Sequence, residues 1–387
     1  MPVLSKVRNA PIIPPFKKGT VWSGPCHHGP NGGVTFSMLS RFLQCRERFR
    51  LYVMEGLKPS DQFNHRIEYG NMWHVCEEQY AAWDRDPRVG TKWQDALHSY
   101  CQGLHKRYLM QQEEIVHWHI VCKVQFPLYI DYWQQHPDVV NRTPLFQEQV
   151  FDVLYPLPSG KKVRLRGKWD SVDLVGKDDD AGIYLQENKT KGQIIEEQLK
   201  RQLTFDLQTM IYLVAMEETQ KVLKEDEPRS CLFKLQKYLG KIKGVRYNVI
   251  RRPLSGGKGT IVRHKPSKSN PEGESQEHFY ARLKDYIAEE PETYFMRWKV
   301  EIIAEDIKKF KNQCLNPILE QLCEWWECVS GAKEKTLFNN EHGIHWRHPY
   351  GLSNILNEGG SSDLDHYLET GSEVGLQRTD QLFGELV

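Results

Sequence analysis

Two stretches decide the expected fold: VRLRGKWDSVDLV at residues 163–175 and IYLQENKT at residues 183–190. Apolar and polar residues alternate in the first stretch, which is typical of a half-buried β-strand. The sequence GKDDDAG between the two stretches favours a turn, so we expect a β-hairpin. A third strand near residues 148–155 would complete an antiparallel meander.

The expected register of this hairpin brings two carboxylates together. If the turn is centred between Asp178 and Asp179, the numbers of paired residues sum to 357, which places Asp170 opposite Glu187. Cross-strand neighbours lie about 4.5 to 5.5 Å apart, so the two groups would repel unless a cation or a proton lay between them. Lys189 shares the face of Glu187 because side chains along a strand repeat every second residue.

An Asp, a Glu and a Lys on one face have the composition of a site that hydrolyses phosphodiesters. Carboxylate oxygens are preferred ligands of Mg²⁺ and Mn²⁺, and such a metal lowers the pKa of a bound water. A lysine beside the metal can position the attacking water or stabilise charge on the phosphorus. The alternative interpretation of a bare D…ExK pattern is the solvated face of an ordinary hairpin, with Lys189 paired to Glu187.

Helical patterns surround these strands. Apolar residues recur at intervals of three and four over residues 36–53, with Thr35 or Ser37 as the N-cap, and further helices are expected over residues 67–83 and 92–110. After the hairpin we expect one long helix over about 194–223, a strand over 245–251, and helices again from residue 277. The expected fold is α/β (α+β), with helical N-terminal and C-terminal extensions.

Four short elements follow one another in order: Gly70-Asn-Met-Trp-His74, Gly167-Lys-Trp-Asp170, Glu187-Asn-Lys189-Thr190 and Gln208-x-x-x-Tyr212. Their order and spacing resemble those of the RecB-like nucleases of the PD-(D/E)XK superfamily, over residues 35–215. The resemblance implies a restriction-endonuclease-like core, with a mixed sheet built on an antiparallel meander and flanked by helices. We place an irregular arm at residues 1–34, this core at 35–310 and a helical and loop extension at 311–387.

The resemblance also implies a role for each matching residue. The expected metal ligands are His74, Asp170, Glu187 and the backbone carbonyl of Asn188. Lys189 would be the catalytic lysine, with Gln208 and Tyr212 beside the active site and the DNA. Glu148 would correspond to an acidic residue that precedes the metal-binding aspartate in many relatives. Taken without the resemblance, His74 would be interpreted as a core or surface histidine. Gln208 and Tyr212 would be interpreted as ordinary helix-packing residues.

The net charge of +1, from 52 Lys and Arg against 51 Asp and Glu, conceals an uneven distribution. Residues 234–268 contain eleven Lys or Arg and no Asp or Glu, and a second basic stripe alternates along residues 162–168. Such a run is often only a solvated face, but beside a nuclease core it predicts contacts with DNA phosphates. The expected DNA-binding residues are Lys162, Arg164, Arg166, Lys168, Lys191, Arg251, Arg252, Lys258 and Arg263.

The nine cysteines lack the spacing of a disulfide framework, so we expect reduced thiols. Many relatives in the RecB-like branch, including CRISPR-associated nucleases, have an iron–sulfur cluster bound by four cysteines. Cys45 matches the first of these, but Cys314, Cys323 and Cys328 would be scattered around a helix, so we expect no iron–sulfur cluster. The histidine triplet within residues 342–348 matches no compact zinc motif and is interpreted as structural.

These patterns and the resemblance together predict a Mg²⁺- or Mn²⁺-dependent DNA nuclease in phage or bacterial recombination, repair or processing. An exonuclease is the preferred interpretation, and an endonuclease is the alternative that the sequence leaves open. HWRHPYG at residues 345–351 resembles a C-terminal element of phage-encoded members of the superfamily. DNA is the expected partner, with a separate helicase, recombinase or single-strand-binding protein as further candidates. No window is apolar enough to span a membrane and no signal peptide is recognisable, which predicts a cytoplasmic location, in the bacterial host for a phage protein. The alternative is a cleavage-inactive DNA-binding or recruitment module that retains the fold.

Overall fold

The chain divides into two compact units in the computed structural model. The described residues are 20–44, 46–59, 62–83, 92–134, 142–176, 181–222, 241–254, 260–268, 271–330 and 376–386. The first unit comprises Met1–Asp61, Asp152–Gly167 and Lys311–Val387, and the second comprises Gln62–Phe151 and Lys168–Phe310. Each unit is therefore assembled from segments that are distant in the sequence.

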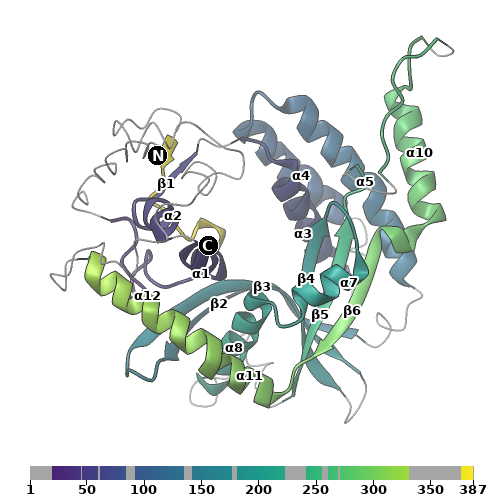
Figure 1. The fold of residues 1–387 in the computed structure, drawn as a ribbon. Helices are drawn as coiled ribbons and strands as arrows, with labels where there is room; N and C mark the ends of the chain where they lie inside the picture. The colour runs from purple at the N-terminus through teal and green to yellow at the C-terminus, as the bar shows by residue number, and fades with distance from the viewer. Residues whose placement is uncertain are drawn as a thin grey trace, which may run out of the picture. The chain divides into compact units, whose positions relative to one another are not determined.

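A five-stranded mixed sheet has the strand order β2-β3-β4-β5-β6 (Figure 1). Its strands are β2 (Arg142–Pro156), β3 (Lys162–Val175), β4 (Gly182–Lys191), β5 (Ile242–Arg251) and β6 (Phe295–Glu301). β3 and β4 are antiparallel, β4 and β5 are parallel, and β5 and β6 are antiparallel. The expected mixed sheet is confirmed, and so is the expected strand at residues 245–251.

The register of the β3–β4 hairpin is the predicted one. Ser171 pairs with Gln186 and Val172 with Leu185, so the numbers of paired residues sum to 357. Asp170 and Glu187 are the next residues along the two strands. Most of β4 is buried, because a strand paired on both sides and covered on both faces has little contact with solvent.

Helices of the second unit pack side by side: α3 (His65–Trp83), α4 (Lys92–Arg107), α5 (Gln112–Gln134) and α10 (Gln276–Glu289) (Figure 1). Trp73 lies at the centre, with its ring 5.0 Å from that of Phe126 and 5.1 Å from that of Tyr129. The helices expected at 67–83 and 92–110 are confirmed, whereas α5 was not predicted. None of the described helices has the length and apolarity needed to cross a bilayer.

The prediction of one long helix over residues 194–223 is wrong. The structure has two helices, α7 (Glu196–Leu203) and α8 (Leu207–Val222). Phe205, between them, has a φ of 55°, in the left-handed region that breaks a right-handed helix. The Asp206 carboxylate then accepts a 3.4 Å hydrogen bond from the Thr209 backbone N–H, as an N-cap residue does when a new helix begins.

The C-terminal part of the second unit also differs from the expected all-helical region. After α10, strand β6 completes the sheet beside β5, and helix α11 (Ala304–Phe310) follows. β6 is only seven residues long and lies between helices, so its weak alternation was missed.

The first unit contains α1 (Phe36–Gln44), α2 (Arg46–Phe49), the π-helical turn Arg50–Met54, a second π-helical turn Lys311–Leu315, and α12 (Asn316–Val329). A two-stranded sheet joins β1 (Leu57–Pro59) to β7 (Leu376–Arg378). Aromatic rings form the core of this first unit. The ring centroids of Phe42 and Trp325 lie 5.6 Å apart, and those of Trp22 and Trp326 lie 4.9 Å apart. The Thr35 hydroxyl accepts a 3.3 Å hydrogen bond from the Met38 N–H, which confirms Thr35 as an N-cap.

Candidate active site

Three side chains with metal-ligand atoms converge within the second unit. His74 comes from α3, Glu148 from β2 and Asp170 from β3, and one ligand atom of each lies within 4.8 Å of the others. His74 Nδ1 is 3.1 Å from Glu148 Oε1 and 3.8 Å from Asp170 Oδ2. One imidazole nitrogen and several carboxylate oxygens at this spacing suit a divalent cation.

Helix α3 reaches this position because Gly70 allows it to lie close to β4. A Cβ atom at Gly70 would lie 3.2 Å from the Thr190 hydroxyl oxygen, closer than most side-chain contacts allow. His74 is four residues further along α3 and so lies on the same face of the helix as Gly70. The spacing of the Gly70-x-x-x-His74 element therefore has a structural reason.

Glu148 has an unusual backbone conformation inside β2. Its φ of 46° lies in the left-handed region, which residues other than glycine rarely adopt. Its carboxylate bonds to His74 on one side and to Lys168 Nζ, at 2.6 Å, on the other. Burial alone would raise the pKa of Glu148, but the hydrogen bonds from His74 and Lys168 outweigh burial and lower it. Strained residues cluster at functional sites, where surrounding contacts hold them in place.

Asp170 and Glu187 are both buried next to this cluster. The Asn188 backbone N–H donates a 2.8 Å hydrogen bond to Asp170 Oδ2, which ties β4 to β3 at the site. Glu187 Oε1 accepts a 2.6 Å hydrogen bond from Lys189 Nζ, whereas its buried Oε2 accepts none from the residues that the structure describes. A buried carboxylate oxygen without a donor is the kind of atom that a bound cation satisfies.

Burial and the closeness of the charged groups shift the pKa values of the site. Burial and the charge of Asp170 raise the pKa of Glu187 to about 7, and burial raises the pKa of Asp170. Burial would lower the pKa of His74, but Asp170 and Glu148 outweigh burial and raise it to about 9. A bound proton or a bound cation would each reduce the repulsion among these carboxylates. The residues present therefore fit a divalent metal ion.

Lys189 joins the carboxylates to α8. Its Nζ donates at 2.6 Å to Glu187 and at 2.7 Å to Gln208 Oε1, and Gln208 Nε2 donates at 3.3 Å to the Tyr212 hydroxyl. Burial would lower the pKa of Lys189, but the neighbouring Glu187 raises it, so the amine stays an ammonium. The structure thus brings the four elements of the sequence together, although their roles stay predictions.

Asn188 contributes to the site differently from its neighbours. Its side chain points to the face of β4 opposite Glu187 and Lys189, where Asn188 Oδ1 accepts a 2.8 Å hydrogen bond from Asn248 Nδ2. Asn248 also donates to Glu77 and Tyr129 in a buried polar network. This network fixes the backbone of Asn188, whose carbonyl stays a predicted metal ligand.

The basic residues expected to bind DNA lie in different surroundings. Arg164 and Arg166 belong to the first unit, where they donate to backbone carbonyls of the 28–32 loop and pair with Asp152. Arg251 and Arg252 are only 2% and 8% exposed, so little of either side chain is available to a phosphate. The contacts of all these residues with DNA stay predictions.

The remaining basic residues are distributed as follows. Lys168 pairs with Glu148 at the site, Lys191 is half-buried at the end of β4, and Lys162 and Arg263 are exposed. Lys258 lies outside the described residues. Burial and the charge of Lys189 lower the pKa of Lys191.

The residues considered for an iron–sulfur cluster or zinc are only partly described. Cys314 lies in the Lys311–Leu315 turn, and Cys323 and Cys328 lie in α12, where Cys323 Sγ is 3.9 Å from Cys26 Sγ. Cys45 and residues 342–348 lie outside the described residues. The expected absence of an iron–sulfur cluster stays a prediction.

Glu148 is the residue that the expected ligand set omitted. The sequence offered one signal, an acidic residue in the strand before Asp170. The local backbone conformation that turns this side chain toward His74 cannot be recognised from the residue types alone.

A mixed sheet with an aspartate on one strand, a Glu-x-Lys pair on the next and helices on its faces defines a restriction-endonuclease-like fold. A family model of the PD-(D/E)XK nuclease superfamily matches residues 34–327, and the chain belongs to this superfamily. Membership in this superfamily suggests that the protein is a nuclease and implies a metal-dependent phosphodiesterase. The comparison with curated proteins finds no match.

Proposed function

We propose that the protein is a Mg²⁺- or Mn²⁺-dependent DNA exonuclease that acts in phage or bacterial recombination, repair or processing. One observation carries the hydrolytic part of this proposal. The ammonium of Lys189 lies within hydrogen-bond distance of Glu187, whose second oxygen has no donor among the described residues, in a buried site that includes His74 and Asp170. A solvated hairpin face would have no reason to bury these groups together.

His74, Glu148, Asp170 and Glu187 would hold the metal. When bound, the metal supplies a water of lowered pKa and neutralises charge that develops on the phosphate. Because Lys189 stays protonated beside Glu187, it acts as a hydrogen-bond donor and a positive charge rather than as a base. Gln208 holds the ammonium in place from α8, so that Lys189 can orient the water or contact a phosphate oxygen.

The finer parts of the proposal rest on the resemblance to RecB-like nucleases. That resemblance favours DNA over RNA, an exonuclease over an endonuclease, and a phage-associated pathway with a separate helicase, recombinase or single-strand-binding protein. It also favours action in the cytoplasm, in the bacterial host for a phage protein. Exposed Arg263, Lys265 and Lys268 in the second unit are consistent with binding to a polyanion.

A cleavage assay with matched substrates tests the proposal. The protein is incubated with Mg²⁺, with Mn²⁺ or with EDTA, on linear and closed circular DNA, single-stranded and double-stranded, and on RNA. We expect metal-dependent loss of linear DNA while circular DNA survives, and no loss with Lys189→Ala. Cleavage of circular DNA would show an endonuclease, and tight DNA binding without any cleavage would instead support the inactive binding module.

A further inference from the structure

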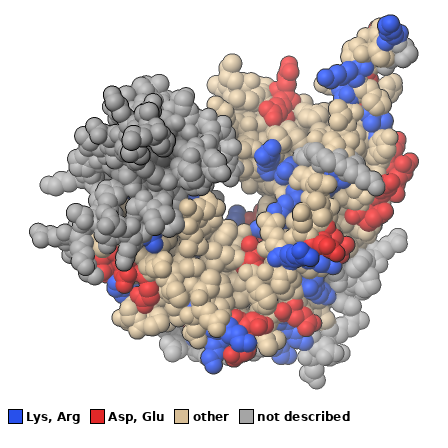
Figure 2. Space-filling model, in the orientation of Figure 1, with Lys and Arg blue, Asp and Glu red and all other residues tan. Residues whose placement is uncertain are grey.

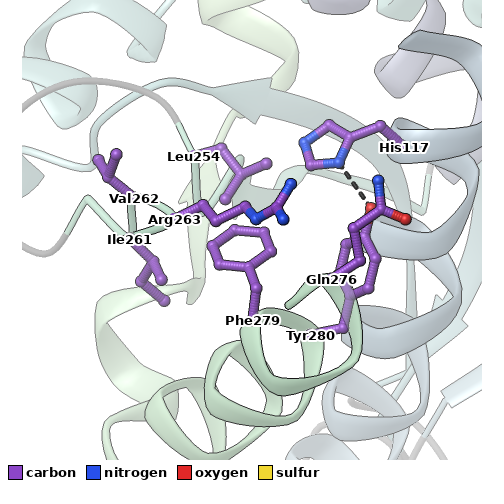
Figure 3. A pocket seen from close by; sticks show the side chains of 8 residues that line it. All are labelled: His117, Leu254, Ile261, Val262, Arg263, Gln276, Phe279 and Tyr280. Carbon is purple, nitrogen blue, oxygen red and sulfur yellow. Dashed lines mark hydrogen bonds between the residues drawn. The ribbon is translucent and has the colours of Figure 1, made fainter. Parts of the chain in front are cut away.

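A cavity of about 250 Å³ lies in the second unit, between α5, α10 and the segment that precedes α10 (Figure 3). The side chains that matter for its chemistry are His117, Leu254, Ile261, Arg263, Phe279 and Tyr280. The residues expected at the active site do not line it, so the cavity requires its own explanation.

One side of the cavity is aromatic and uncharged. The His117 ring is nearly parallel to that of Phe279, at 19° and 6.2 Å, and His117 Nδ1 lies 2.7 Å from the Tyr280 hydroxyl. Burial and the charge of Arg263 lower the pKa of His117, which keeps its ring neutral at pH 7. The wall therefore offers flat rings and hydrogen-bonding groups without a net charge.

The other side carries the charge of Arg263, which pairs with no carboxylate among the residues that the structure describes. Arg263 Nε donates to the Glu274 backbone carbonyl at 2.6 Å, and its two terminal nitrogens donate to none of the described residues. Figure 3 shows the guanidinium reaching into the cavity. The nearby Glu274 carboxylate is already occupied by Arg282, which donates to both of its oxygens at 2.6 and 2.7 Å.

Positive charge continues along the exposed segment that leads from the cavity. Residues 260–268 contain Arg263, Lys265 and Lys268 and no Asp or Glu, and the two lysines form no ion pair with any part of the chain that the structure describes. Figure 2 shows Lys and Arg side chains on this projecting segment, at the upper right. An adjoining hollow of about 410 Å³ shares His117 and Tyr280 but contains Glu113, which disfavours an anion there.

We propose that this cavity binds one nucleotide of single-stranded DNA, with its base among His117, Phe279 and Tyr280 and its phosphate on Arg263. A nucleobase has apolar faces and a polar edge, which matches a neutral aromatic wall with hydrogen-bonding groups. The cavity is smaller than the roughly 300–1,000 Å³ of typical drug-sized sites, so one base suits it. The next phosphates follow Lys265 and Lys268. The choice of DNA as ligand rests on the proposed function.

Binding to strands with and without bases tests this assignment. The full chain carrying Lys189→Ala is kept in EDTA, so that no strand is cut, and fluorescence anisotropy measures the Kd of a labelled oligonucleotide. A strand of the same length built from abasic residues has the same phosphates but no bases. We expect the abasic strand to bind about tenfold more weakly, because it has no base to stack in the cavity.

Variants locate the effect in the cavity. Arg263→Ala should weaken binding of the intact strand about tenfold, whereas Lys284→Ala, which removes an exposed charge from α10, should change it less than twofold. Gln276→Trp adds bulk at the cavity wall without removing a charge, and should abolish the difference between intact and abasic strands. Equal affinity of the parent protein for both strands, or equal losses with Arg263→Ala and Lys284→Ala, would overturn the assignment.

Free dAMP serves as a competitor because a mononucleotide has the same chemistry as one unit of a strand. Displacement of the strand by dAMP at concentrations near the strand's own Kd would assign the cavity to free nucleotides and contradict the single-strand assignment. These binding measurements do not depend on cleavage. Failure of the cavity assignment therefore leaves the cleavage assay of the unmodified protein as a separate test of the proposed function.

Discussion

Gln208 Oε1 accepts a hydrogen bond from Lys189 Nζ at 2.7 Å, in addition to the 2.6 Å hydrogen bond that the same ammonium donates to Glu187. The contact joins α8 to β4 at the residue proposed to orient the attacking water. Its removal should leave Lys189 charged but freer to move. We expect Gln208 to position the Lys189 ammonium and not to change its charge.

Substitutions along this hydrogen-bonded chain should therefore form a series. We expect Lys189→Ala to abolish cleavage, Gln208→Ala to lower kcat about tenfold to a hundredfold, and Tyr212→Phe to lower it less, because the Tyr212 hydroxyl acts on Lys189 through Gln208. Steady-state cleavage of linear DNA gives kcat, and thermal unfolding with and without Mg²⁺ shows whether metal binding is retained. Full activity of Gln208→Ala would contradict the positioning role.

Metal binding should depend on pH in a defined direction. The pKa of Glu187 is raised from 4.5 to about 7 and that of His74 from 6.5 to about 9, so both groups contribute stability at low pH that is lost as pH rises through these values. A bound metal replaces the protons, so the gain in Tm from Mg²⁺ should grow between about pH 6 and pH 9. Thermal unfolding in Mg²⁺ and in EDTA at each pH measures it. A gain that shrinks with rising pH would rule out these ligands.

Glu148 should contribute to metal affinity although sequence patterns placed it outside the ligand set. Glu148→Gln keeps the shape of the side chain but removes its charge, and should weaken Mg²⁺ binding roughly tenfold or more. The matched control is Asp152→Asn, also on β2, where the carboxylate pairs with Arg164. Calorimetric titration with Mg²⁺ distinguishes the two. Unchanged affinity in Glu148→Gln would reduce Glu148 to a structural partner of His74.

The sequence predicted the hairpin register because two short-range features determine it. Alternating residues define the faces of β3 and β4, and the turn expected from GKDDDAG predicts the pairing that brings Asp170 next to Glu187. The sequence also predicted the residues of the site, because each motif lies within a single helix or strand and can be recognised from local spacing. Their assembly depends on the close approach of α3 to β4 at Gly70.

Features that depend on backbone conformation or distant partners were not predictable in this way. The break at Phe205 and the backbone conformation of Glu148 both require positive φ at residues other than glycine, for which the residue types give no signal. The alternating basic residues 164 and 166 were recognised, but the carbonyls of the 28–32 loop that they bind lie more than 130 residues away in the sequence. Burial of Arg251 likewise follows from tertiary packing and not from local charge.

Cys26 should be an unusually reactive thiol. The contact with Cys323 Sγ, at 3.9 Å, lowers the pKa of Cys26 to about 7, with a further contribution from Lys161, whereas burial raises the pKa values of Cys76 and Cys101. At pH 7.5 we expect iodoacetamide to modify Cys26 faster than either buried thiol, as followed by peptide mass spectrometry. Cys323→Ala should slow that reaction by raising the pKa. A rate at Cys26 that is the same in Cys323→Ala would show that Cys323 does not activate it.

Two glycines provide a matched test of the sheet that carries the site. Gly244, in β5, has a φ of 148°, and a Cβ atom there would lie 2.0 Å from the Val300 carbonyl oxygen of β6. Gly244→Ala should destabilise the protein by roughly 2 kcal/mol or more, because the contact is with backbone and the neighbouring strand must move.

Gly103, inside α4, has no atom within 4 Å of the corresponding position, so Gly103→Ala should stabilise the protein by about 0.5–1 kcal/mol. Urea unfolding followed by circular dichroism gives both changes on the same scale. The changes in the free energy of unfolding should have opposite signs in the two variants. The methyl group of Gly244→Ala meets the backbone of β6, whereas that of Gly103→Ala meets open space. A Gly244→Ala protein as stable as the parent would mean that β6 does not lie against β5 at Val300 in this register.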